Sequence, residues 1–277
     1  MIEFQLLPYR VEVTIDDDRL GSVLDYLVNG ARQPLDPRAV MRYSVTGRGP
    51  YELSEEGRHL VTVGRADDVL YLVYQRCHAR LADYLSLGGW VPLHAGMVSV
   101  GGRRALVIGG KGSGKTTLML RLLFDGHRVE GDETVYTRRG MAVCLPRNFH
   151  VKPGTAALIP ELARLGASAR LPATSTSDGM VITGFNPSTA GHPWTIGDGP
   201  VDAAFVLHPD HGGTASCRPV DGLRLVEAAV ANCFPSTVGT GPVVAACSSL
   251  LGDVDGYELT VGDVGSTARL LAAALGG

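Results

Sequence analysis

The segment from residue 109 to residue 117 constrains this chain more than any other. It reads GGKGSGKTT, so four residues separate Gly109 from the run Gly114, Lys115 and Thr116, which is the spacing of a phosphate-binding loop. Glycines let backbone N–H groups curve around phosphate oxygens, because no Cβ blocks the approach. Lys115 offers a point charge to the β- and γ-phosphates, and Thr116 offers a hydroxyl to Mg²⁺.

The residues on either side of this loop support the same interpretation. Residues 104–108 (RALVI) are short and apolar, as in a covered strand, and residues 115–124 have the pattern of a helix that ends at Gly126. A loop between a strand and a helix presents the helix N-terminus to an anion. The residues predicted to bind the nucleotide are Gly109, Gly110, Lys111, Gly112, Ser113, Gly114, Lys115, Thr116 and Thr117.

Two acidic residues follow at a useful distance. Asp132 and Glu133 lie 17 and 18 residues after Lys115, directly behind a short predicted strand at 129–131. We expect that strand to lie beside the P-loop strand, so that both carboxylates are close to the phosphates. One would hold Mg²⁺, and the other would accept a proton from a substrate hydroxyl. The alternative is an acidic turn on the surface.

The remaining pattern predicts an α/β fold with a smaller α+β domain at the N-terminus. Strands are expected at 4–15, 41–45 and 60–63, and helices at 20–27 and 66–87. Gly88 and Gly89 end the last of these helices, so domains are predicted at 1–88 and 89–277. Later elements are predicted as strands at 91–100, 135–137, 141–145, 201–208 and 257–261, and as helices at 223–232, 243–251 and 266–275. Residues 155–200 have no clear pattern.

Composition excludes several classes of function. The net charge is −3 and charged residues make up 19% of the chain, so there is no basic footprint for nucleic acid or for an anionic membrane surface. No apolar run reaches the roughly 20 residues of a membrane span, and no signal-peptide pattern begins the chain. We expect a soluble, cytoplasmic protein. The five scattered cysteines fit buried, reduced thiols, with a catalytic or zinc-binding cysteine as the alternative.

Three segments in order resemble a known family. They are LHAGMV at 93–98, GKGSGKTTL at 110–118 and DGHRVEGDE at 125–133. Together they are similar to the catalytic core of HPr kinase/phosphorylase and its HPr-kinase-like relatives, which include lasso-peptide kinases that phosphorylate a serine. The resemblance covers residues 91–155 and implies a P-loop kinase core that uses ATP and Mg²⁺.

The resemblance also implies roles for individual residues. His94 matches the active-site histidine of the family, Asp132 matches the general base, and Glu133 stands where a second aspartate would bind Mg²⁺. In the segment RNFHVKPG at 147–154, Arg147 and Lys152 are expected to face the substrate or a phosphate.

We therefore expect transfer of the γ-phosphoryl group of ATP to a hydroxyl, on a serine of a peptide or protein. Two alternatives remain open: a kinase acting on a small metabolite alcohol, and a nucleotide-dependent regulatory module without transfer. An LSGGQ-like signature and an NKxD motif are both missing, which argues against an ABC-type ATPase and a Ras-like GTPase. The oligomeric state and the preference for ATP over GTP stay open.

Overall fold

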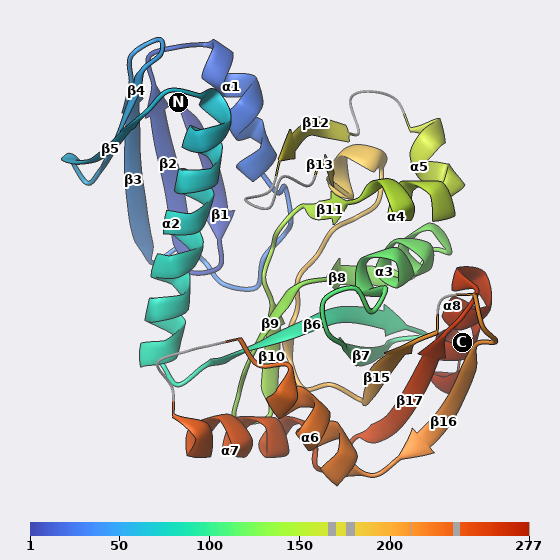
Figure 1. Ribbon diagram of the computed structural model, residues 1–277. Helices are drawn as coiled ribbons and strands as arrows, with labels where there is room; N and C mark the ends of the chain where they lie inside the picture. Colours follow the sequence, from blue (N-terminus) through green and yellow to red (C-terminus); the bar gives the residue numbers. More distant parts are fainter. Residues whose placement is uncertain (166–169, 176–180, 211, 235–238, 277) are drawn as a thin grey trace.

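The computed structural model describes residues 1–165, 170–175, 181–210, 212–234 and 239–276. Its strands form three sheets: one from the N-terminal residues, a larger mixed sheet, and a small third sheet (Figure 1). Helices pack against each of the two larger sheets. The chain is therefore a mixed α/β protein with a separate N-terminal sheet, as the sequence predicts. None of the described helices is long and apolar enough to cross a membrane.

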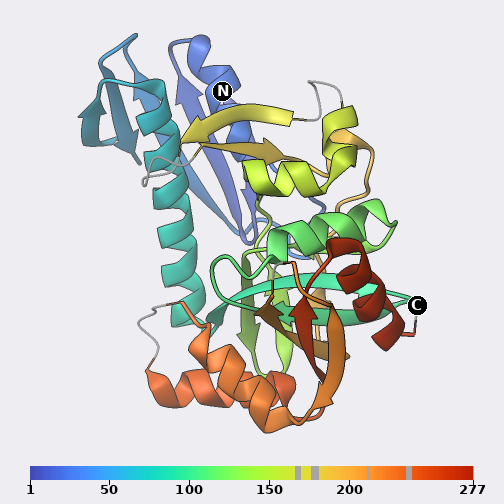
Figure 2. The same cartoon turned by 45° about the vertical axis from the view of Figure 1, so that its right-hand side comes forward.

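The N-terminal sheet has the strand order β1-β2-β3-β4-β5. Its strands are β1 (Ile2–Leu6), β2 (Tyr9–Ile15), β3 (Ala39–Thr46), β4 (Tyr51–Glu55) and β5 (Arg58–Val63), and its helices are α1 (Arg19–Leu24), η1 (Asp25–Leu27) and α2 (Ala66–Leu87). On β2, buried and more exposed residues alternate along the strand, and the buried ones face the helices. In Figures 1 and 2, α2 stands along this sheet and extends down toward the larger one.

Two predictions for this region were wrong in detail. The single strand predicted at 4–15 is a hairpin, because the chain reverses at Leu7 and Pro8 and pairs Leu6 with Tyr9. Leu7 has φ of 52°, a conformation outside the extended region, so the strand cannot continue through it. Strand β4 was not predicted, although β3 and β5 on either side of it were.

The larger sheet has the order β14-β10-β9-β6-β7-β15-β17-β16, with β8 paired to β6. Its strands are β6 (Val91–Val100), β7 (Arg103–Ile108), β8 (Arg128–Gly131), β9 (Thr134–Arg138), β10 (Met141–Cys144), β14 (Asp198–Gly199), β15 (Ala203–Pro209), β16 (Ser216–Val220) and β17 (Asp255–Val261). Strands β7, β15 and β17 are parallel, whereas β6 is antiparallel to β7. Residues 105–108 of β7 are fully buried, as expected for a strand covered on both faces.

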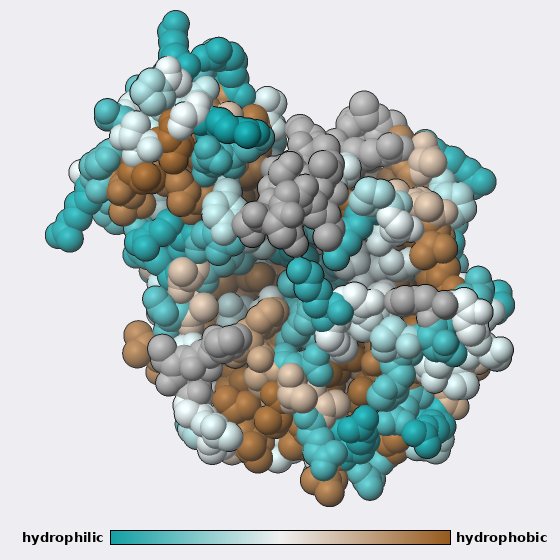
Figure 3. Space-filling model, viewed as in Figure 1, coloured by the Kyte–Doolittle hydropathy of each residue, from teal (hydrophilic) through white to brown (hydrophobic). Residues whose placement is uncertain are grey.

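Helices cover the two faces of this sheet. They are α3 (Lys115–Phe124), α6 (Gly222–Ala231), α7 (Thr240–Leu251) and α8 (Val264–Ala274). Figure 1 shows α6 and α7 below the sheet and α3 above it, and Figure 3 shows hydrophobic residues gathered on the surface over α6 and α7. Leu223 on α6 and Val244 on α7 are among the exposed apolar residues there.

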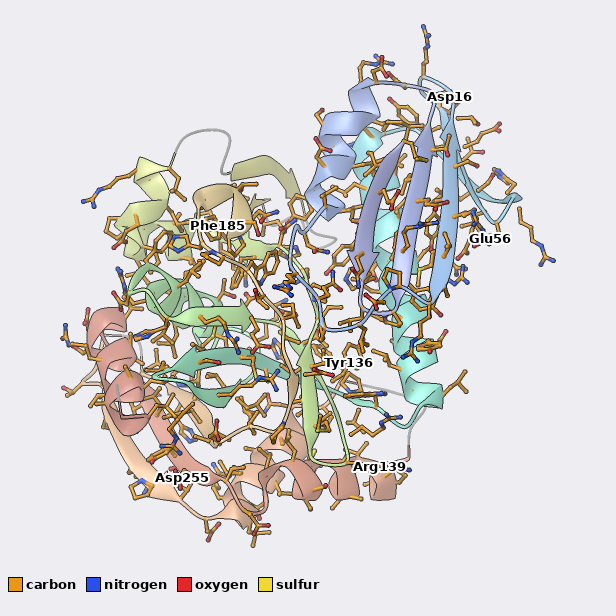
Figure 4. All side chains as sticks on the ribbon, turned by 180° about the vertical axis from the view of Figure 1, so that it is seen from behind. Asp16, Glu56, Tyr136, Arg139, Phe185 and Asp255 are labelled. Carbon is orange, nitrogen blue, oxygen red and sulfur yellow. The ribbon has the colours of Figure 1, made fainter. Side chains whose placement is uncertain are left out.

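A third layer lies between α3 and the N-terminal sheet. It contains β11 (Phe149–Val151), β12 (Arg170–Ser175), β13 (Val181–Phe185), α4 (Pro153–Leu158), α5 (Pro160–Arg164) and η3 (Ser188–Ala190). These elements fall largely in the stretch without a clear sequence pattern. Phe185, labelled in Figure 4, lies in this layer and is fully buried beside Phe149. The boundary between residues 88 and 89, where α2 ends and β6 soon begins, stays a prediction.

The position of β8 corrects one further expectation. We expected this strand beside the P-loop strand β7, but β8 pairs with β6, which lies between them. The hairpin formed by β6 and β7 already occupies that edge of β7. The ten residues of β6 are long enough to pair with β9 through residues 91–94 and with β8 through residues 97–99.

Candidate active site

The glycine-rich loop connects β7 directly to α3, as predicted. Gly112 has φ of 84° and Gly114 has φ of 93°, both in the left-handed region that a side chain disfavours. Gly114 is the N-cap of α3, so the loop turns its backbone toward the axis of that helix. The N-terminus of α3 follows directly from the loop, and a helix N-terminus behind a glycine-rich loop is the arrangement that binds phosphate.

Lys115 is the first residue of α3, and it is 5% exposed. Its Nζ donates to the carbonyl oxygens of Gly109 at 2.6 Å and of Gly110 at 3.1 Å. Burial lowers the pKa of Lys115 to about 8, although the charges of Glu133 and Asp132 raise it; the nearby charge of Lys152 adds to the lowering. A triphosphate in the loop would supply the negative charge that this buried ammonium lacks.

The two acidic residues emerge from a break in the sheet. Strands β8 and β9 pair one after the other with β6, and Asp132 and Glu133 form the short connection between them. The N–H of Ala95 still donates to the carbonyl oxygen of Glu133 at 3.1 Å, so the connection stays attached to β6. The register of the β6–β8 pair shifts between Met97 and Val98, an irregularity of the kind that redirects side chains out of a ladder.

Asp132 contacts the loop directly. It is 2% exposed, and its Oδ2 accepts a hydrogen bond from Thr116 Oγ1 at 2.6 Å. Both groups therefore converge on the position where a metal ion bound to the β- and γ-phosphates would lie. The predicted proximity of the acidic pair to the loop is present, although β6 separates their strands.

Glu133 is the more accessible of the two acids, with 39% of its side chain exposed. Its Oε2 lies 3.7 Å from His94 Nε2. Burial raises the pKa of Glu133, but the nearby His94 ring and the charge of Arg147 outweigh that effect and lower the pKa to about 2. Glu133 is thus a carboxylate over the physiological pH range.

His94 is fixed by a segment that follows α6. The backbone N–H of His94 donates to the carbonyl oxygen of Asn232 at 2.8 Å, and the centroid of the His94 ring lies 5.3 Å from that of Phe234. Asn232 also approaches the loop, because a Cβ added at Gly110 would lie 3.8 Å from Asn232 Oδ1. Nothing in the sequence pattern singled out Asn232 or Phe234, since they lie more than a hundred residues from the loop.

Arg147 reaches the acids rather than open solvent. It is 8% exposed, and its Nη2 lies 3.2 Å from Asp132 Oδ1 and 3.5 Å from Glu133 Oε2. The guanidinium therefore neutralises part of the charge of the pair. Its predicted contact with the substrate stays a prediction.

Lys152 occupies a different position from Arg147. It is the N-cap residue of α4 and lines a cavity of about 180 Å³, whose other walls are mostly apolar and include Val151, Pro153 and Phe185. Its predicted role toward the substrate also remains open.

The other loop residues differ in their surroundings. Lys111 is exposed. The buried hydroxyl of Ser113 has no hydrogen-bond partner among the described residues, so it is available to a ligand in the loop. Thr117 Oγ1 lies 3.0 Å from Thr155 Oγ1, which ties α3 to α4 and gives this residue a structural contact.

The site suits a magnesium-bound nucleotide better than a metal held by protein alone. Among the residues that the structure describes, no group of three or more His, Cys, Asp and Glu side chains is placed to hold a metal ion. Thr116 and Asp132 offer two adjacent oxygens. Mg²⁺ commonly takes one or two protein oxygens and completes its six ligands with phosphate oxygens and water, so this pair fits it.

Comparison with known proteins gives a distant structural match. No family model matches the chain. No curated protein matches it either. The chain is structurally similar to the Hpr(Ser) kinase/phosphatase from Coxiella burnetii, with 13% sequence identity and a TM-score of 0.31 over 67% of this chain and 99% of the other. At that distance the likeness says nothing of individual residues, so the chemistry of the chain is inferred from the contacts in its own site.

Proposed function

We propose that this protein is a kinase that transfers the γ-phosphoryl group of ATP to a hydroxyl, on a serine of a peptide or protein. The observation that carries the proposal is the 2.6 Å contact between Thr116 of the glycine-rich loop and the buried carboxylate of Asp132, with Glu133 and His94 beside it. A loop that only holds a nucleotide has no need of a second, accessible carboxylate next to the phosphates.

The loop binds and orients the triphosphate. Backbone N–H groups of residues 109–117 surround the phosphates, and the Lys115 ammonium leaves its two carbonyl partners to contact the β- and γ-phosphates. Thr116 and Asp132 would hold Mg²⁺, which when bound would offset charge on the phosphate oxygens.

The geometry favours an exchange of the roles expected for the two acids. Both oxygens of Asp132 are engaged, one by Thr116 and one by Arg147, and the residue is buried, which suits a metal-side acid. Glu133 is exposed enough to meet an acceptor and is oriented by His94. As the acceptor oxygen forms its bond to the γ-phosphorus, the bond from that phosphorus to the β–γ bridging oxygen breaks and ADP leaves. With a pKa of about 2, Glu133 is an ionised but weak base, so it receives the hydroxyl proton only as the new bond to phosphorus makes that proton acidic.

Substitution of Lys115, Asp132 and Glu133 tests this assignment. With γ-labelled ATP and an extract of the cells that make the protein, the native chain should label an acceptor and Lys115→Ala should label none. Glu133→Gln should keep magnesium-dependent nucleotide binding and lower transfer by about 10²-fold or more. Asp132→Asn should weaken binding and transfer together.

Arg139 is exposed at the tip of the hairpin between β9 and β10 (Figure 4). The variant Arg139→Ala removes a cation far from the proposed chemistry, so it is the control and should behave like the native chain. Normal labelling by Lys115→Ala would refute the kinase proposal. If Asp132→Asn kept binding and lost transfer while Glu133→Gln did not, the two roles would return to those expected from the sequence.

A further inference from the structure

A group of buried polar atoms joins the N-terminal residues to the acidic pair. Five side-chain atoms at this junction have no hydrogen-bond partner among the described residues: Tyr26 Oη, His78 Nε2, Arg147 Nε, Asn148 Oδ1 and His150 Nε2. Four of these residues, all except His150, line one small cavity of about 20 Å³. Buried polar atoms are rarely left unpaired, so their gathering at one place needs a cause.

The hydrogen bonds at the junction determine which of these atoms donate. Arg147 Nη1 lies 2.6 Å from His150 Nδ1, and a guanidinium has only donors, so His150 Nδ1 accepts and its proton is on Nε2. His78 Nδ1 lies 2.7 Å from the carbonyl oxygen of Tyr74, which only accepts, so the proton of His78 is on Nδ1 and its Nε2 is an acceptor. Burial lowers the pKa of His150 to about 2 and that of His78 to about 4, so both rings are neutral.

The unpaired atoms then form a complementary set. His150 Nε2–H and Arg147 Nε–H are donors, whereas His78 Nε2 and Asn148 Oδ1 are acceptors. The Asn148 amide is fixed in this orientation, because its Nδ2 donates to the carbonyl oxygens of Tyr26 at 2.8 Å and Val28 at 3.1 Å. The cavity of about 20 Å³ has room for about one water, and its wall includes His78, Arg147 and Asn148 but not His150. A water there can accept from Arg147 Nε–H and donate to His78 Nε2 and Asn148 Oδ1.

We propose that His150 and a buried water form a junction through which the N-terminal residues hold Arg147 against Asp132 and Glu133. Tyr26 and Tyr74 enclose the His150 ring, with centroids 5.6 and 6.1 Å away. His150 in turn accepts from the guanidinium whose other end contacts both acids. Arg147 and His150 are therefore positioning residues, and η1 and α2 contribute to the active site without touching the substrate.

The effect on transfer is the first test, and this part rests on the proposed kinase function. His150→Leu removes the acceptor and should lower kcat by about 10- to 100-fold, as the loss of an outer hydrogen-bond partner of an active site commonly does, with KM for ATP changed less than about twofold. His150→Asn places a carbonyl oxygen near the position of Nδ1 and should restore most of the rate. His59→Leu, exposed on β5, is the control. If thermal melting shows that the His150→Leu variant is folded and its rate equals the native rate, the proposal is overturned.

The protonation of the rings is a second test that needs no activity. In the full-length chain labelled with ¹⁵N at histidine, His150 should carry its proton on Nε2 and His78 on Nδ1, both unchanged between about pH 5.5 and 8. A crystal structure of the full-length chain should show a water within hydrogen-bond distance of His78 Nε2 and Arg147 Nε. The opposite tautomers, or no water there, would refute the junction even if transfer were normal. If Lys115→Ala and the native chain were equally inactive, the kinase proposal would fail. The ¹⁵N signals of His78 and His150 would still show whether the proposed junction is present.

Discussion

Lys115 holds its proton less tightly than a lysine in water does. The ammonium is buried, and its hydrogen-bond partners in the structure are two backbone carbonyls, which replace the surrounding water only in part. Burial is the main reason why its pKa is lowered to about 8. Arrival of a triphosphate adds several negative charges beside the ammonium and raises that pKa again.

Nucleotide binding should therefore take up protons near pH 8. At that pH about half of the Lys115 side chains are neutral in the free protein, and all become charged in the complex, so about half a proton is taken up. At pH 6 the side chain is already charged and contributes no uptake. Calorimetric titration with ATP in two buffers of different ionisation enthalpy measures this number directly.

Lys115→Arg provides the matched control, because a guanidinium stays charged at both pH values. Any protons that belong to the nucleotide itself appear equally in both titrations and cancel in the difference. An uptake at pH 8 that is the same for the native chain and for Lys115→Arg would contradict the lowered pKa.

At the scale of elements, the P-loop depends on how α3 begins. The chain enters this helix through Gly114, whose φ of 93° is strained for any residue with a Cβ. The N–H groups that would bind phosphate follow directly from this turn. A change of backbone at this one position thus alters the direction of several donors together.

Gly114→Ala should weaken nucleotide binding by at least about tenfold, because alanine in this conformation costs on the order of 1–3 kcal/mol and the loop relaxes away from it. Titration with a fluorescent ATP analogue measures the change. Gly241→Ala, in helix α7 where an added Cβ meets no atom within 4 Å, is the control and should leave affinity unchanged. Equal affinities for the two variants would show that the loop does not need the left-handed turn.

Elements with strong local signals could be predicted from the sequence. Helix α2 (Ala66–Leu87) and helix α3 have the predicted bounds, because glycines stand directly after α2 and directly before α3. The pairing of β6 with β8 and β9 on one edge could not be predicted, since it depends on contacts between distant strands. The same holds for the reversal at Leu7 and Pro8, where a non-glycine residue adopts a left-handed conformation.

The candidate site shows the same limit. The loop and the acidic pair were found because each is a compact motif. The segment at 147–154 was noticed, but the contact of Arg147 with Asp132 and the acceptor role of His150 were not. The first is a contact between side chains on different segments, and the second depends on Tyr26 and Tyr74, which come from the other end of the chain and leave no local pattern near residue 150.

At the scale of the whole molecule, one buried ion pair connects several strands. The Arg104 guanidinium on β7 makes two hydrogen bonds of 2.9 Å to the Glu130 carboxylate on β8. Arg104 also donates to the carbonyl oxygens of Ala142 at 3.1 Å and Gly199 at 2.9 Å. Because Glu130 is fully buried, neither charge has water as a substitute partner.

Removal of one partner should therefore destabilise the fold strongly. Glu130→Ala leaves the guanidinium buried without its carboxylate and should lower the free energy of unfolding by about 3–5 kcal/mol. Urea denaturation followed by circular dichroism measures this change. Arg103→Ala, which removes the neighbouring exposed pair with Asp255, should cost less than about 1 kcal/mol. Similar midpoints for the two variants would contradict the stabilising role of the buried pair.

The central place of β6 fixes a length inside the active site. This strand is bonded on one edge to β7, which ends at the loop, and on the other to β8, which ends at the acids. The strands that deliver the phosphate-binding loop and the carboxylates are therefore two backbone spacings apart, about 10 Å in total. Hydrogen-bonded ladders do not stretch, so closure around a nucleotide and an acceptor must come from side-chain rotation and from the loop, while the sheet stays the same width in every state.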